Sequence, residues 1–189
     1  MPIYIIEHLE PKLWKWCRIE YKHISKIVGK DNIWITKLKW GNKELSNYGK
    51  VIKNSISELE LNNACVLDPE AEKLLAPKEA KKFDYFVFGG ILGDYPPKKR
   101  TEIELSPKLL PNAERRNLGK EQMSTDNAIY VTKQIVDGTS LEKIKFQDEM
   151  EIEKEEGISI QLPYRYALVD GKPLISEELL DYLKKKKGF

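Results

Sequence analysis

The chain has 189 residues, of which 41% are hydrophobic and 33% charged, enough for one compact domain or one domain with a small lobe. Lysine and arginine number 32 against 30 acidic residues, and the net charge of +2 excludes the global basic bias that indicates nucleic-acid binding. No apolar run approaches the ~20 residues of a membrane-spanning helix, and the amino terminus is unlike a signal peptide.

The first half of the chain alternates between strand-like and helix-like segments. Expected strands are Ile3–Glu7, Asn32–Ile35, Ala64–Leu67 and Asp84–Phe88; expected helices are 11–28, closed by Gly29, and Tyr48–Leu59, with a loop at Leu38–Ser46 in which Trp40 packs. Repeated strand–helix–strand units of this size indicate an α/β fold with a mainly parallel sheet.

The second half continues this pattern and then changes character. Expected elements are a helix within Thr101–Leu110, a strand at Ala113–Leu118, a helix from Ser124–Asp126 to Asp137–Gly138, an acidic strand at Asp148–Glu156, strand-like alternation at Ile158–Val169 broken at Pro163, a hairpin turn at Asp170–Gly171 with Leu174–Ile175 returning along the partner strand, and a last helix capped by Ser176. We therefore expect a single domain over 1–189, with 140–175 as a β-rich carboxyl-terminal extension or hairpin.

The cysteines predict the compartment. Cys17 and Cys65 lie far apart and lack the spacing of metal ligands, as is typical of buried, reduced thiols in a cytoplasmic protein. No metal site is expected.

A glycine-containing loop follows the aromatic strand Asp84–Phe88 and organises the interpretation. Gly89 and Gly90 come directly after the strand, and Gly93 and Asp94 follow. Adjacent glycines let the backbone turn sharply and approach a ligand closely, because no Cβ intervenes. Ligands of open α/β sheets bind beyond the carboxyl ends of the strands. The sequence therefore predicts a cofactor loop at Gly89–Asp94.

A second loop of this kind, Asn117–Gly119, leads to the helix start at Ser124–Asp126. In a parallel sheet both loops reach the same edge, where Ile91, Leu92, Leu118 and Met123 could pack against an adenine. Neither a G-x-G-x-x-G near the first strand nor a P-loop occurs, which argues against NAD and ATP. The alternative is that the loops are only turns.

Four segments together resemble a known family. The segments are Phe83–Thr101, Leu118–Ile129, Ile5–Glu10 and Leu162–Tyr166. They resemble the SPOUT methyltransferases, in the branch that contains a fungal ribosomal-protein arginine N-methyltransferase and was earlier described as predicted RNA methyltransferases. The resemblance implies a Rossmann-like α/β domain with a carboxyl-terminal deep trefoil knot, S-adenosylmethionine bound in the knot loops, and a monomer or homodimer.

Carried over by motif, the resemblance implies these cofactor-binding residues: Phe88, Gly89, Gly90, Ile91, Gly93, Asp94, Leu118, Gly119, Met123 and Thr125.

For the reaction itself, a carboxylate that pins a guanidinium would orient it and favour loss of its proton. Asp94, Glu7 and Asp126 are the candidate catalytic carboxylates, with turn or helix capping as the alternative for Asp94 and Asp126. His8 and Arg100 are candidate substrate-binding residues; the alternatives are a structural histidine and a solvated basic face.

Three functions remain open from the sequence. The first is N-methylation of an arginine on a ribosomal protein or ribosome, favoured by the acidic run Asp148–Glu156, which would attract a basic protein and repel RNA. The second is RNA methylation, favoured by the basic clusters at Lys98–Arg100 and Lys184–Lys187. The third is a non-catalytic binding module with the same fold. No membrane partner is expected.

Overall fold

The computed structural model describes residues 1–39, 43–92, 98–109, 113–155 and 157–186. Its main sheet is built from the strands β1 (Ile3–His8), β2 (Ile33–Thr36), β3 (Lys50–Val51), β4 (Ala64–Leu67), β5 (Tyr85–Gly90) and β6 (Ala113–Arg116). Their order is β3-β2-β1-β5-β4-β6, and every pair is parallel. The predicted parallel α/β sheet is confirmed, and all its described strands end at one edge.

Both faces of this sheet are covered, as a parallel sheet requires. The helices are α1 (Lys15–Val28), α2 (Pro77–Ala80), α3 (Ser106–Leu109), α4 (Thr125–Val136) and α5 (Glu177–Lys185). Successive residues of β1 point to opposite faces: Tyr4 and Ile6 pack toward α1 and α4, while Ile5 packs toward α3. Single turns at Lys30–Asn32, Leu45–Asn47, Ile56–Glu58, Thr101–Leu105 and Leu141–Lys143 complete the connections.

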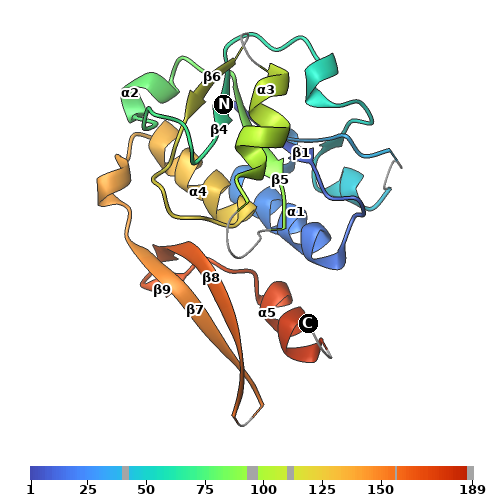
Figure 1. Ribbon diagram of the computed structural model, residues 1–189, viewed down its shortest axis with the longest axis vertical. Helices are drawn as coiled ribbons and strands as arrows, with labels where there is room; N and C mark the ends of the chain where they lie inside the picture. Colours follow the sequence, from blue (N-terminus) through green and yellow to red (C-terminus); the bar gives the residue numbers. More distant parts are fainter. Residues whose placement is uncertain (40–42, 93–97, 110–112, 156, 187–189) are drawn as a thin grey trace.

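The carboxyl-terminal part forms a second sheet. The strands β7 (Phe146–Glu155), β8 (Ile158–Val169) and β9 (Lys172–Pro173) are antiparallel, and β7 and β8 make a long hairpin that projects from the main body beside α5 (Figure 1). Its apolar face packs against α5 and against Ile19 of α1. Asp170 and Gly171 have φ of 51° and 76°, so the predicted tight turn is confirmed.

β8 runs through Pro163, although a break was expected there. The pairing of β7 with β8 shifts register between Asp148 and Met150, and Glu149 has a φ of 61°. A proline has no N–H to donate to a sheet, and such an irregularity accommodates it.

The expected helix at Tyr48–Leu59 is wrong. Lys50 and Val51 instead pair with β2 as an edge strand. A single turn follows at Ile56–Glu58, fixed by a capping box in which Ser55 and Glu58 bond each other's backbone.

The start of α1 and the end of β5 differ from the expected positions. α1 begins at Lys15, after Trp14, so Pro11 precedes the helix; Gly29, with a φ of 82°, ends it as predicted. Gly89 and Gly90 belong to β5, opposite Glu7 and His8 of β1, so the chain turns after them.

The Trp40 prediction lies outside the described residues. Among the described residues, no helix is long and apolar enough to cross a membrane.

Candidate active site

A cavity of about 450 Å³ lies at the carboxyl edge of the parallel sheet. Its walls come from the end of β5, the segment between β6 and α4, α1 and β8. This volume falls within the usual range for small-molecule sites. The two predicted glycine-containing loops therefore converge on one cavity.

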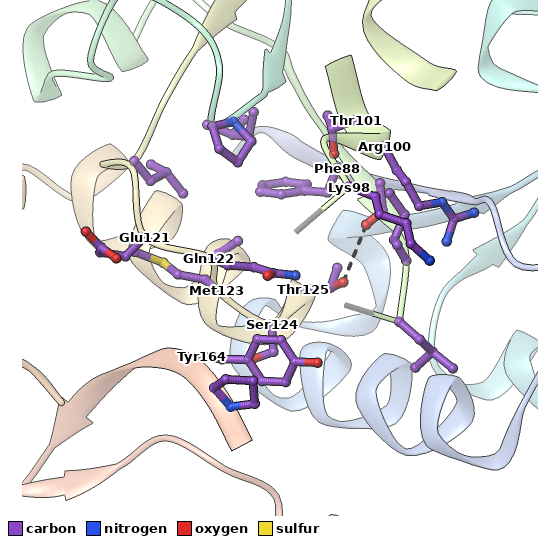
Figure 2. A pocket seen from close by; sticks show the side chains of 18 of the residues that line it. Phe88, Lys98, Arg100, Thr101, Glu121, Gln122, Met123, Ser124, Thr125 and Tyr164 are labelled. Carbon is purple, nitrogen blue, oxygen red and sulfur yellow. Dashed lines mark hydrogen bonds between the residues drawn. The ribbon is translucent and has the colours of Figure 1, made fainter. Parts of the chain in front are cut away.

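One part of the cavity is apolar. Leu67, Phe88, Leu118 and Met123 line it. Figure 2 shows Phe88 and Tyr164 on opposite sides, with Gln122 and Thr125 between them. Apolar walls with a few polar groups are what an adenosyl group needs, since its purine faces are apolar and its edges bond polar groups.

Gly89 keeps the cavity floor open. A Cβ built on it would lie 2.8 Å from Ile91 Cδ1 and 3.2 Å from Thr101 Oγ1. The Thr125 hydroxyl donates a hydrogen bond of 3.4 Å to the Gly89 carbonyl, which joins the start of α4 to the end of β5 (Figure 2). Both residues line the cavity, as do Ile91 and Gly119.

Gly90 has a different role from the one expected. A Cβ there would lie 2.6 Å from the Tyr21 hydroxyl oxygen and 2.9 Å from Ile6 Cγ2. It is absent from the described lining of the cavity, and it permits α1 to pack closely on the sheet. Gly93 and Asp94 lie outside the described residues.

Glu7 is buried away from the cavity. Its carboxylate accepts hydrogen bonds from Thr36 Oγ1 at 2.5 Å, Ser55 Oγ at 2.6 Å and the Ile56 amide at 3.0 Å. It is fully buried, and these donors compensate for its desolvation. The geometry gives Glu7 a structural position between β1, β2 and the turn at Ile56–Glu58, rather than the catalytic position expected.

His8 also lies behind the cavity wall. Its Nδ1 is hydrogen-bonded to the Tyr21 hydroxyl at 2.8 Å, whereas its buried Nε2 has no partner among the described atoms. Burial lowers the pKa of the His8 imidazole, with Glu10 acting in the opposite direction. His8 is absent from the described lining of the cavity, and its expected contact with substrate stays a prediction.

Arg100 lines the cavity, but its guanidinium is already engaged. It donates to Glu10 Oε1 at 2.6 Å, to Glu104 Oε1 at 2.7 Å and to the Leu9 carbonyl at 3.1 Å. The expected contact with substrate would have to compete with these bonds.

Asp126 sits in the first turn of α4, as predicted, and is 2% exposed. Its Oδ2 accepts a hydrogen bond of 2.8 Å from His23 Nδ1, and its Oδ1 accepts from Ser124 Oγ at 2.6 Å and from the Asn127 amide at 2.9 Å. The carboxylate of Asp126 therefore has hydrogen-bond donors from the protein on both oxygens. Asp126 is absent from the described lining of the cavity.

The sequence analysis missed Trp16 and Glu20, which reach the cavity from α1. Glu20 is 5% exposed, and burial raises the pKa of its carboxyl well above the usual range. The neighbouring charge of Asp126 raises that pKa further, and a hydrogen bond with Trp16 opposes the shift. One signal was available: Glu20 shares the buried face of the helix with Cys17, Tyr21 and Ile24.

The segment before α4 is attached to the hairpin. The Arg165 amide donates a 2.8 Å hydrogen bond to the Gln122 carbonyl, and Met123 and Arg165 form a parallel bridge. Among the described residues, no cluster of His, Cys, Asp and Glu could hold a metal ion.

Comparisons with known proteins agree with this site. The family described as "Protein arginine N-methyltransferase SFM1-like" matches residues 3–188. Protein arginine N-methyltransferase SFM1 of Saccharomyces cerevisiae is 39% identical over 207 residues, covering 96% of this chain and 94% of the relative. The crystal structure of yeast SFM1 complexed with SAM has a TM-score of 0.88 and 38% identity, covering 97% of this chain and 90% of that one.

A more distant structure, the dual specific Trm10 of Thermococcus kodakaraensis, has a TM-score of 0.57 at 20% identity, covering 76% of this chain and 96% of that one. This likeness shows the fold alone. The fold, the cavity and these relatives define an S-adenosylmethionine-dependent methyltransferase of the SPOUT class. The chain belongs to the SFM1-like family of protein arginine N-methyltransferases.

Proposed function

We propose that this protein transfers a methyl group from S-adenosylmethionine to an arginine side chain of a protein. The observation that carries the proposal is the cavity at the sheet edge, where the end of β5 and the segment before α4 meet. The cofactor supplies a methyl group activated by a sulfonium sulfur. The protein must therefore bind both reactants in line and accept a proton from the arginine.

The residues present fit an adenosyl group. Phe88, Leu118 and Met123 would enclose the adenine, and Gly89 leaves the space that a side chain would fill. Thr125 and the backbone at Ile91 and Gly119 would bind the polar parts of the ligand. Gly93 and Asp94 are also proposed as cofactor-binding residues, because they match the motif of the family. The same motif supports Asp94 as a proposed catalytic residue.

The charge distribution favours a protein over RNA as substrate. Three basic residues at or near the cavity are paired: Lys99 with Glu70 at 2.6 Å, Arg115 with Asp68 at 3.3 Å, and Arg100 with Glu10 at 2.6 Å. A lysine or arginine that is already paired with a carboxylate contributes less to the binding of phosphate groups. The cluster at Lys98–Arg100, one of the two that suggested RNA methylation, therefore supports that alternative less.

The outer face of the hairpin favours a basic protein such as a ribosomal protein. Glu151 and Glu153 of β7 are exposed and pair with Gln161 and Ser159 of β8, and Gln161 also lines the cavity. An acidic surface that begins at the cavity would steer a basic segment toward it.

Labelled S-adenosylmethionine and ribosomes from a strain without this activity test the proposal. After incubation, protein and RNA are separated and the label is located. Label in the protein fraction, recovered as methylarginine after hydrolysis, is the expected result. Label found only in RNA would contradict an arginine substrate and would show that the protein methylates a nucleoside. If calorimetry detects no binding of S-adenosylhomocysteine, the protein is a non-catalytic module.

We further propose a cytoplasmic, monomeric protein with a trefoil knot in its carboxyl-terminal part. Cys17 and Cys65 are buried, free thiols, and the described lining of the cavity comes from a single chain. The segments after β4 and β6 lie together, because the Leu75 amide donates to the Asn117 carbonyl at 3.0 Å. Stretching single molecules from both ends tests the knot: an unfolded length equal to the whole chain would contradict it. Sedimentation measures the oligomeric state, and a dimer would contradict the monomer.

A further inference from the structure

Two segments of the cavity wall that are separate in the sequence are bound by one carboxylate. Residues 91–92 follow β5 directly, residues 98–101 come later, and both segments line the cavity. The Oε1 atom of Glu10, just after β1, accepts hydrogen bonds from the Leu92 amide at 3.1 Å and from Arg100 Nη1 at 2.6 Å. Glu10 itself is absent from the described lining of the cavity. It therefore contacts the wall from the side away from the ligand space.

The bond between Glu10 and Arg100 joins two partly buried charges. The Glu10 side chain is 10% exposed and that of Arg100 is 21% exposed. Hydrogen bonds between ionised groups are stronger than neutral ones, and an ion pair out of water is screened less than one at the surface. Glu104 raises the pKa of the Arg100 guanidinium, with partial burial acting against this shift and Glu10 acting with it. The guanidinium thus stays charged and keeps its partner.

Arg100 extends this constraint to the floor of the cavity. Its Nη2 donates to the Leu9 carbonyl at 3.1 Å, and its guanidinium points away from Phe88 in Figure 2. The next residue is Thr101, whose hydroxyl oxygen lies 3.2 Å from the position that a Cβ on Gly89 would take. The place of Thr101 beside Gly89 therefore depends on where Arg100 is held.

The bond to the Leu92 amide fixes the orientation of a peptide group. The N–H and C=O of a trans peptide point in opposite directions. Because the Leu92 N–H points at Glu10, the Ile91 carbonyl faces away from Glu10. Backbone groups that are oriented before the ligand arrives do not have to be ordered when it binds, which favours affinity.

We propose that Glu10 is a positioning residue for the cofactor. By accepting hydrogen bonds from Leu92 and Arg100 together, it holds the two wall segments at the separation and orientation that S-adenosylmethionine needs, without touching the ligand. This inference rests on the proposed methyltransferase function and adds a residue that acts through the cavity wall.

Calorimetry with S-adenosylhomocysteine tests the proposal in two variants. Glu10→Ala removes both hydrogen bonds, and we expect it to raise Kd by about tenfold or more. Glu10→Gln keeps an acceptor oxygen at this position and should stay within about threefold of the wild type. A loss of folded protein alone would lower the fitted number of sites and leave Kd unchanged. If Glu10→Gln binds no better than Glu10→Ala, the proposal is wrong, because the Leu92 amide needs only an acceptor.

Glu104→Ala is the matched control. Glu104 pairs with the same guanidinium, accepting from Arg100 Nε at 2.7 Å, but it does not bond Leu92 and is absent from the described lining of the cavity. We expect this variant to bind S-adenosylhomocysteine within about threefold of the wild type. If Glu10→Ala binds as tightly as the wild type, or Glu104→Ala is weakened as much, Glu10 has no special role. If the wild-type protein does not bind S-adenosylhomocysteine, the proposed function itself fails.

Amide hydrogen exchange gives an independent measurement of the wall. The Leu92 amide should exchange about tenfold faster or more in Glu10→Ala, whereas Val87 within β5 should be unaffected. Unchanged exchange at Leu92 would show that Glu10 does not hold this segment. In initial-rate measurements, Glu10→Ala should raise KM for S-adenosylmethionine and leave kcat within about threefold. A fall in kcat at unchanged KM would contradict a role in cofactor positioning.

Discussion

Buried acids near the sheet edge differ in what balances their charge. Glu7 accepts hydrogen bonds from neutral donors, Asp126 from His23, Ser124 and a backbone amide, and Glu20 from Trp16. The first two are satisfied by the fold itself. The charge of Asp126 raises the pKa of the Glu20 carboxyl, as burial does, and the hydrogen bond with Trp16 opposes both effects.

The raised pKa of Glu20 predicts a pH-dependent stability. Glu20 holds its proton more tightly in the folded protein than in the unfolded chain, so its contribution is fully present below the unfolded pKa and falls as pH rises toward the folded pKa. The groups that face it are Asp126, with His23 behind it, Tyr166 and Trp16.

Urea unfolding of the wild type and Glu20→Gln between pH 5 and 7.5 measures this contribution. We expect the stability of the wild type relative to the variant to decrease with pH, by at most about 1.4 kcal/mol per pH unit. A difference that stays constant or increases with pH would contradict the raised pKa.

Glu7→Ala should destabilise the protein without affecting the ligand. The variant leaves the Thr36 hydroxyl, the Ser55 hydroxyl and the Ile56 amide without their acceptor, and we expect a loss of about 3–5 kcal/mol in urea unfolding. Affinity for S-adenosylhomocysteine at low temperature should change by less than about twofold. Glu60→Ala, an exposed neighbour, serves as the control and should stay within about 0.5 kcal/mol. A loss of ligand affinity in stable Glu7→Ala protein would restore a role for Glu7 in the site.

At the scale of elements, the close contact between α1 and β5 depends on a missing side chain. Gly90→Ala places a Cβ within 3.1 Å of the Glu7 carbonyl as well as against Tyr21 and Ile6, and the backbone cannot give way as a flexible side chain would. We expect a destabilisation of about 1–3 kcal/mol, measured by thermal or urea unfolding. Tyr21→Phe in the Gly90→Ala background should cost less than it does alone, because the clash with the hydroxyl is relieved. Strict additivity would show that the hydroxyl is not the obstacle.

Elements with a strong local signal could be predicted from the sequence. The apolar strands β1, β4 and β5, the amphipathic α1 with its Gly29 terminus, and the Asp170–Gly171 turn all follow from periodicity and turn chemistry. The segment Tyr48–Leu59 has helical spacing too, but a non-local contact decides its structure. A Cβ at Gly49 would lie 3.0 Å from Ile33, so glycine lets this segment pack as an edge strand on β2.

The site was predictable only in part for the same reason. Residues at or just after the end of a strand could be placed at the sheet edge from the sequence, which located Phe88, Gly89, Leu118 and Met123. Trp16 and Glu20 lie in the first two turns of α1, and their place in the cavity depends on how α1 and β8 pack around it. No local pattern encodes that packing.

At the scale of the whole molecule, acidic and basic residues are arranged unevenly. Lys99, Arg100 and Arg115, at or near the cavity, pair with Glu70, Glu10 and Asp68, whereas the outer face of the hairpin carries exposed Glu151 and Glu153. The net charge of +2 hides this arrangement. A basic protein segment would meet the acidic face first and the cavity next.

Reversing the charge of this face should weaken capture of the substrate. We expect Glu151→Lys/Glu153→Lys to raise KM for a basic protein substrate by about tenfold at low salt, with little change in kcat, because the residues steer binding and do not touch the reacting atoms. The difference between variant and wild type should shrink as salt increases. Initial rates at several salt concentrations measure it, with Glu142→Lys, on a turn outside the hairpin strands, as control. A fall in kcat at unchanged KM would refute a steering role.

The hydrogen bond between the Arg165 amide and the Gln122 carbonyl connects the β7–β8 hairpin to the segment before α4. The hairpin would contact the incoming polypeptide, and the segment before α4 would bind the nucleoside. We expect a shift of either segment to change the position of the other. The cofactor and the polypeptide would therefore not bind independently. Binding of one would change the affinity for the other, and by thermodynamic reciprocity the factor would be the same in both directions.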